Sequence, residues 1–177
     1  MSHTYASAAI EAIYHFLPRA FVYGFDIKAR SIIAYSSIMA GYAMELASFT
    51  SEHSLANTLC AFYPEIHPGA AVIMISRAYY ELIISKHVCD ERFVEMAGKM
   101  GLRDATQPLD FIAMLLDLQR NCGVNEMKMT NYDIDPEDFV PMAKRARATM
   151  GNCFKSDLYE LSEEDCVEIY CKSYYNS

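Results

Sequence analysis

EHSLANTLCAFYPEIHPG, residues 52–69, is the stretch that decides how this chain folds. Pro64 cannot lie inside a helix without removing a hydrogen bond and clashing with the preceding turn. Pro68 biases His67 away from helical backbone angles. We therefore expect a short helix from His53 to about Tyr63, a tight turn, and a second helix that starts at about Gly69.

The turn matters because it separates two histidines, His53 and His67, that lie fourteen positions apart. On one unbroken helix this spacing corresponds to roughly 21 Å at ~1.5 Å per residue. Ligands of one metal ion lie about 2 Å from it, so only a bent chain could let both imidazoles share an ion. The alternative is that both histidines are ordinary packing or surface residues. Asn57 follows His53 by one helical turn.

Length and composition predict an all-α fold. A chain of 177 residues suits one domain, and 53% of its residues are hydrophobic, above the usual ~45–50%. Only seven glycines and six prolines are present, too few for a turn-rich β fold. We expect a single helical domain over residues 1–177, a compact bundle of about seven to eight helices. The predicted helices cover residues 5–17, 27–47, 53–63, 69–88, 90–100, 108–120, 136–150 and 163–174.

The same composition argues against several partners. The net charge of −8 is opposite to the basic patch that nucleic-acid binding needs. No run of about twenty apolar residues is present, so no membrane span is expected. Residues 1–5 show no basic region leading into an apolar one, so we expect no signal peptide and a cytoplasmic protein. The six cysteines contain no Cys-x-x-Cys pair and are interpreted as reduced, mostly buried thiols.

Several residues indicate where helices begin and end. Asp26 is a predicted N-cap for the second helix, and Asp135 precedes a first-turn proline. Ser162 opens an approximate capping box with Asp165. Pro18 is expected to stop the first helix, with Arg19 reaching the last-turn carbonyls.

Residues 53–69 resemble the signature of the iron-dependent (group III) alcohol dehydrogenases, in which His-x-x-x-His-x-x-Gly is followed by five variable residues, Pro and His-Gly. His53 and His67 match its first and last histidines in type and spacing. Asn57 stands at the middle histidine and Cys60 at the glycine. The resemblance extends along most of the chain through Leu-Pro-Arg-Ala at 17–20, Ala-Gly at 40–41 and the helix at 162–174.

The chain departs from the family pattern in two further places. Residues 45–52 contain no glycine, although the family has a glycine-containing loop there. The family's Asn-Pro-Arg before the last helix is replaced by residues 154–158, Phe-Lys-Ser-Asp-Leu. The first departure, the absence of glycine, concerns the substrate and nicotinamide end of the family's site.

The resemblance implies that His53 and His67 bind a divalent metal, iron or zinc, and that Asn57 lies on the substrate side. The family's other two ligands, an Asp and a His, lie upstream of this segment, and no Asp-x-x-x-His occurs in the chain. No glycine-rich phosphate loop is present, so NAD(P) would be bound mainly by an absent N-terminal α/β domain. We therefore expect half of an oxidoreductase that interconverts small alcohols and aldehydes, inactive alone, with no catalytic residue of its own.

The enzyme half and the alternative named next both predict an exposed apolar face, which the absent N-terminal domain or self-association of the chain would cover. The alternative to the enzyme half is a degenerate, non-catalytic helical domain that serves assembly or protein interaction.

Overall fold

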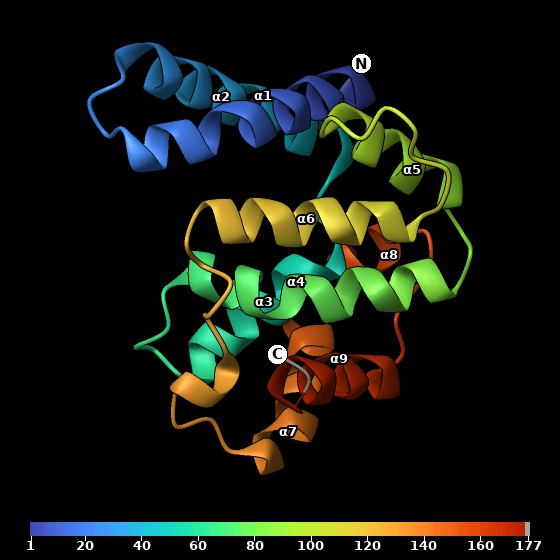
Figure 1. Cartoon of the computed structure of the whole chain (residues 1–177). Helices are drawn as coiled ribbons and strands as arrows, with labels where there is room; N and C mark the ends of the chain where they lie inside the picture. Colours follow the sequence, from blue (N-terminus) through green and yellow to red (C-terminus); the bar gives the residue numbers. More distant parts are fainter. Residues whose placement is uncertain (176–177) are drawn as a thin grey trace. The chain divides into compact units, whose positions relative to one another are not determined.

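The computed structural model describes residues 1–175, and every regular element in this part of the chain is a helix (Figure 1). The all-α prediction is confirmed, with nine α-helices and two short 3-10 helices in the described residues. The helices are α1 (Ser2–Val22), α2 (Ile27–Ala47), α3 (Ser51–Phe62), α4 (Pro68–Ser85), α5 (Asp90–Lys99), α6 (Leu109–Asn121), η1 (Met129–Asn131), η2 (Pro136–Asp138), α7 (Phe139–Thr149), α8 (Gly151–Ser156) and α9 (Glu163–Tyr175).

The described chain forms two compact units, and the first contains residues 1–48 and 89–125. In this unit α1 and α2 lie side by side as a helical hairpin, and α5 packs on α6 and α1 (Figure 1). The buried residues of the hairpin are all small: Ala9 on α1, and Ala29, Ser36 and Ala43 on α2. Small side chains allow close helix approach, and several large apolar residues of both helices are exposed, among them Phe21, Tyr35 and Ile38.

The prediction that Pro18 ends the first helix was wrong. The helix continues through Pro18 to Val22, and its last turn is closed by the Tyr23 N–H, which donates to the Arg19 carbonyl at 2.9 Å. An internal proline removes one backbone hydrogen bond, which the rest of a 21-residue helix can offset. Arg19 does not reach the last carbonyls; its Nε pairs with the Asp26 carboxylate. Asp26 caps α2 as predicted, accepting from the Ala29 N–H at 3.0 Å.

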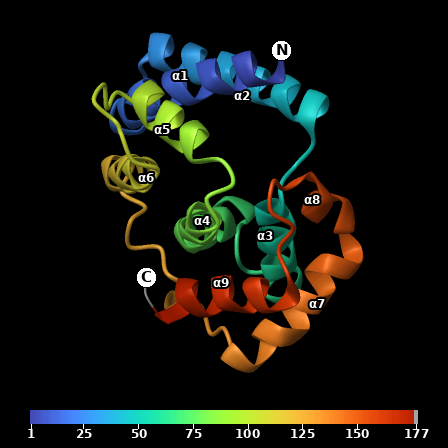
Figure 2. The same ribbon diagram turned by 90° about the vertical axis from the view of Figure 1, so that its right-hand side faces the viewer.

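The second unit contains residues 49–88 and the chain from 126 onward. Its centre is α4, which contacts α3 and α9 (Figure 2). Ten of its eighteen residues are buried, because it is apolar nearly all round. The large, fully buried side chains of the unit include Ile75 on α4 and, from other elements, Leu55, Leu59, Ile66, Phe139, Met142, Phe154, Leu161, Ile169 and Tyr170.

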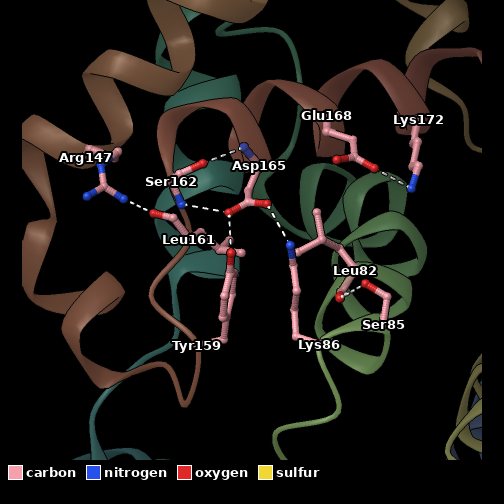
Figure 3. A network of polar contacts seen from close by, with 10 residues as sticks. All are labelled: Leu82, Ser85, Lys86, Arg147, Tyr159, Leu161, Ser162, Asp165, Glu168 and Lys172. Atoms are coloured by element: carbon pink, nitrogen blue, oxygen red, sulfur yellow. Dashed lines mark hydrogen bonds and ion pairs between the residues drawn. The ribbon is translucent and has the colours of Figure 1, made fainter.

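A polar network joins the end of α4 to the start of α9 (Figure 3). The predicted capping box is present: Ser162 Oγ accepts from the Asp165 N–H at 3.1 Å, and Asp165 Oδ2 accepts from the Ser162 N–H at 2.9 Å. The other Asp165 oxygen meets Lys86 Nζ at 3.3 Å, and the Tyr159 hydroxyl donates to Oδ2 at 3.2 Å. Lys86 also lies 4.6 Å from the centre of the Tyr159 ring. The Asp165 carboxylate therefore caps the start of α9 and, through Lys86, links the end of α4 to it.

Two non-glycine residues of the described chain have a positive φ. Ser48, the C-cap of α2, has φ 79° and ψ 172°, and His87 has φ 54°. The Ser48 conformation is essentially restricted to glycine, and it costs a residue with a Cβ of order 1–3 kcal/mol. Ser48 lies in the segment where the family resemblance implies a glycine, so the backbone keeps a glycine-like conformation without the glycine.

Candidate metal-side helix turn

The predicted break at Pro64 is present and is tightly held. α3 ends at Phe62, and the Ile66 N–H donates to the Tyr63 carbonyl at 3.0 Å across the turn. The Tyr63 hydroxyl donates to Asp138 Oδ2 at 2.6 Å and accepts from the Asp135 N–H at 2.9 Å. Ile66 is buried between the two prolines. α3 and α4 then pack against each other, as a chain reversal requires.

His67 starts α4 as its N-cap and is exposed. Its Nδ1 accepts from the Gly69 N–H at 3.1 Å, and Pro68 occupies the first helical position. Proline suits this position because its missing N–H would have no partner there. A neutral imidazole that accepts at Nδ1 carries its proton on Nε2. A metal bound at Nδ1 takes the acceptor atom, and a metal bound at Nε2 leaves the ring proton on Nδ1. Either mode of binding therefore breaks the hydrogen bond from the Gly69 N–H.

His53 lies in the first turn of α3 and is half-buried. Its ring stacks on Phe49 with the ring centres 4.3 Å apart and the planes 17° from parallel. This contact fixes the plane of the imidazole without using either nitrogen. His53 therefore has a defined orientation, which a metal ligand needs.

Asn57 lies one turn beyond His53 on α3 and is also half-buried. Its amide Nδ2 lies 3.6 Å from the Met150 sulfur, a weak acceptor. The amide is thus held loosely and keeps its oxygen for another partner. It has no acid or base function at neutral pH.

The chain alone supplies an incomplete donor set for a divalent ion. Among residues 1–175, no three His, Cys, Asp or Glu side chains gather in a way that could hold a metal. Two imidazoles bind such an ion weakly, since it prefers more ligands and usually a carboxylate. A divalent ion held by His53 and His67 would therefore need further ligands from outside this segment.

The acid beside His53, Glu52, is bound by a residue of α4. Glu52 and Glu65 flank the two histidines, and Glu65 is exposed. The Glu52 carboxyl instead points to Tyr80, whose hydroxyl donates to Oε2 at 2.9 Å. Its Oε1 is buried and has no hydrogen-bond partner among the described residues. Burial raises the pKa of Glu52 to about 7, the bond from Tyr80 opposes the rise, and the charge of Asp157 adds to it.

Asp157 lies beside this half-buried acid and was not predicted from the sequence. It accepts from the Ser51 N–H at 3.1 Å, from the Ser51 hydroxyl, and from the Tyr79 hydroxyl at 3.2 Å. Burial raises its pKa, while the bonds from Ser51 lower it. Asp157 thus caps α3 from a distant segment, because Thr50 makes no side-chain cap. The one signal in the sequence was that residues 154–158 replace the family's Asn-Pro-Arg.

Comparison with known proteins settles the family. The model for the C-terminal part of the Fe-containing alcohol dehydrogenase family matches residues 1–174. The chain belongs to this family. Within the iron-containing alcohol dehydrogenases, the 1,3-propanediol dehydrogenases of Citrobacter freundii and Klebsiella pneumoniae are 29% and 28% identical to it, each over 96% of this chain.

Solved structures of alcohol dehydrogenases share the fold. An archaeal halo-thermophilic enzyme from a Red Sea brine pool has a TM-score of 0.89 at 27% identity, over 97% of this chain and 44% of that one. The alcohol dehydrogenase from Oenococcus oeni has a TM-score of 0.87 at 26% identity, over 97% and 45%. The chain spans 43% of the two propanediol dehydrogenases, so it corresponds to less than half of a family enzyme. No single helix in residues 1–175 is long and apolar enough to cross a membrane.

Proposed function

We propose that this chain is the helical metal- and substrate-side half of an iron-containing alcohol dehydrogenase-like oxidoreductase. The reaction would be the NAD(P)-dependent interconversion of a small alcohol and an aldehyde, in the cytoplasm. The chain would be inactive by itself. The observation that carries the proposal is the family match over residues 1–174 together with His53 and His67 on either side of a rigid turn.

In this proposal His53 and His67 supply two of the ligands of a divalent ion, iron or zinc. An N-terminal α/β domain supplies the remaining ligands and most of the NAD(P) contacts. A bound divalent ion polarises an alcohol oxygen and lowers its pKa. The chain's own part is positional: Phe49 orients the ring of His53, and Tyr63 holds the turn that carries His67. Asn57 presents an amide that can hydrogen-bond a substrate oxygen.

A degenerate, non-catalytic domain is the second candidate, and three observations favour it. Asn57 replaces a histidine of the family signature, His67 is exposed and spends Nδ1 on a helix cap, and no third ligand lies nearby in residues 1–175. Such a domain would serve assembly, by binding an N-terminal α/β domain or by self-association.

A chimeric enzyme distinguishes the two candidates. The segment of the Citrobacter freundii enzyme that precedes its match is fused to residue 1, and NADH formation is followed with 1,3-propanediol and Fe²⁺. We expect turnover in the chimera and none in the chain alone. His53→Ala and His67→Ala should abolish it, while His15→Ala, an exposed histidine on α1, should not. A folded, NAD-binding chimera without turnover would favour the non-catalytic domain, and turnover by the chain alone would contradict the proposal.

A further inference from the structure

The first turn of α3, which carries His53, is fixed from outside the helix. Thr50, the N-cap residue, makes no side-chain hydrogen bond. Asp157, which directly follows α8, instead accepts from the Ser51 N–H at 3.1 Å and from the Ser51 hydroxyl. Ser51 is fully buried, so water cannot replace these bonds. The place of the first turn is therefore set by a carboxylate 106 positions away.

The same carboxylate contacts α4, the helix that begins after His67. The hydroxyl of Tyr79, a buried residue of α4, donates to Asp157 Oδ1 at 3.2 Å. A second bridge lies next to this one, where the Tyr80 hydroxyl donates to Glu52 Oε2 at 2.9 Å. The start of α3 is thus joined to α4 at two adjacent points.

The other end of this pair of helices is fixed as well. There the turn between α3 and α4 is held by Tyr63, which bonds the Asp138 carboxylate and the Asp135 N–H. His67 follows this turn as the N-cap of α4. Each histidine therefore lies next to one of two fixed points on the same pair of helices. Such support keeps the backbone at both histidines in place before any ion binds, as a pre-organised site requires.

The orientation of the His53 ring depends on the same first turn. Phe49, whose ring stacks on His53 with the centres 4.3 Å apart, precedes α3 by two positions. The stack is kept only while the first turn of α3 stays in place relative to the chain before it. A helix whose first N–H groups lose their acceptors frays at that end. Loss of Asp157 therefore releases the imidazole together with Ser51.

We propose that Asp157 is a positioning residue for His53, because it holds Ser51 and Tyr79 at once and so sets where the imidazole lies relative to α4. A plain helix cap would stabilise α3 without deciding where the imidazole lies. The inference rests on the proposed function for the role of His53 as a metal ligand. The placement of the ring does not, since every contact that produces it comes from this chain.

The test is an NMR measurement of the His53 ring in the whole chain, with a chelator present. The signal is identified by its loss in His53→Gln, and stacking on Phe49 should place its ring protons upfield of those of a free histidine. In Asp157→Ala this upfield shift should be lost. In Asp157→Asn it should be largely kept, because the amide oxygen still accepts from the Ser51 N–H although the charge is gone.

Asp165→Ala is the matched control. Asp165 also caps a helix of this unit, accepting from the Ser162 N–H at 2.9 Å, and its carboxylate pairs with Lys86. This variant should lose stability to urea and leave the His53 signal in place. Tyr79→Phe keeps the ring and removes only the hydroxyl, so it decides the matter if Asp157→Ala does not fold. It should move the His53 signal in the same direction by a smaller amount.

An unchanged His53 signal in Tyr79→Phe and in folded Asp157→Ala would overturn the proposal. An equal change of this signal in Asp165→Ala would overturn it too, because any loss of stability would then move the ring.

The chimeric enzyme connects the placement of the ring to the metal. There Asp157→Ala should raise the Fe²⁺ concentration for half-maximal turnover about tenfold, as loss of groups that orient a ligand does, while Asp165→Ala should not. If the unmodified chimera shows no turnover and the NMR shifts are as expected, the proposed function fails and the placement of His53 by Asp157 stands. An active chimera in which Asp157→Ala needs no more Fe²⁺ would contradict the role of Asp157 toward the metal.

Discussion

Replacing Glu52 by Gln should remove a pH dependence from the stability of this domain. The folded chain favours the neutral carboxyl, with a pKa of about 7 against 4.5 for an ordinary glutamic acid. Below pH 4.5 both states are protonated and the contribution to stability is complete. Between 4.5 and 7 the unfolded chain ionises first, so stability falls as pH rises, and above 7 the loss is constant. Each pH unit in that interval is worth ~1.4 kcal/mol, or ~3 kcal/mol in all.

The assay is urea unfolding followed by circular dichroism from pH 5 to pH 8, with a chelator present because His53 is adjacent. The comparison is the change in free energy of unfolding over this range, so any fixed cost of burying an amide cancels. Tyr79, Tyr80 and Asp157 face Glu52 and are left unchanged. The unmodified chain should lose ~2.5 kcal/mol more than Glu52→Gln between pH 5 and pH 8, since part of the loss has already occurred below pH 5.

Glu65→Gln, at an exposed position, is the matched control and should follow the unmodified chain. Parallel pH curves for Glu52→Gln and the unmodified chain would refute the reasoning. They would mean that the carboxyl is hydrated or ionised in the folded state.

Three further predictions follow from single residues. Ser48→Gly should raise the free energy of unfolding by ~1 kcal/mol, because glycine accepts φ 79° without strain, and a loss on urea unfolding would contradict this. Asn57→His should tighten Co²⁺ or Zn²⁺ binding about tenfold or more in calorimetry, since histidines four apart on α3 share one face; the gain must vanish with His53→Ala. Asp165→Asn should cost ~2 kcal/mol at pH 7, because Asp165 loses charge-assisted bonds.

The pH dependence of the last variant has a defined sign. Burial pushes the pKa of Asp165 upward, but the Ser162 N–H and Lys86 outweigh it and hold the pKa below its usual value. The carboxylate therefore stabilises the fold above its unfolded pKa of ~4, and this contribution is lost as pH falls through the lower folded value. The gap between Asp165→Asn and the unmodified chain should close in acid, whereas Glu163→Gln in the same turn should show no gap.

Most of the fold could be predicted from local signals in the sequence. The caps at Asp26 and Ser162 and the break at Pro64 depend on neighbours within a few residues, so their chemistry is visible in the chain. The prediction at Pro18 was wrong because a proline weakens a helix without always ending it. The stability of the whole helix decides whether it continues. The outcome there depends on packing that a local pattern does not contain.

The candidate site was harder because its surroundings come from distant segments. His53 and His67 were placed correctly on either side of a turn, but the stack on Phe49 and the helix cap at Gly69 could not be read from spacing. Glu52, next to His53 in the sequence, accepts from the Tyr80 hydroxyl and lies near Asp157, a residue more than a hundred positions away.

Because His67 caps the start of α4, the Gly69 amide hydrogen reports whether a metal ion is bound at His67. Any ion that takes either ring nitrogen of His67 must leave this amide hydrogen without its acceptor. Exchange of the Gly69 amide hydrogen with deuterium should then become faster, even while exchange in the rest of α4 becomes slower. The exchange rate of this one backbone proton would thus distinguish the metal-bound from the metal-free protein, and no activity measurement would be needed.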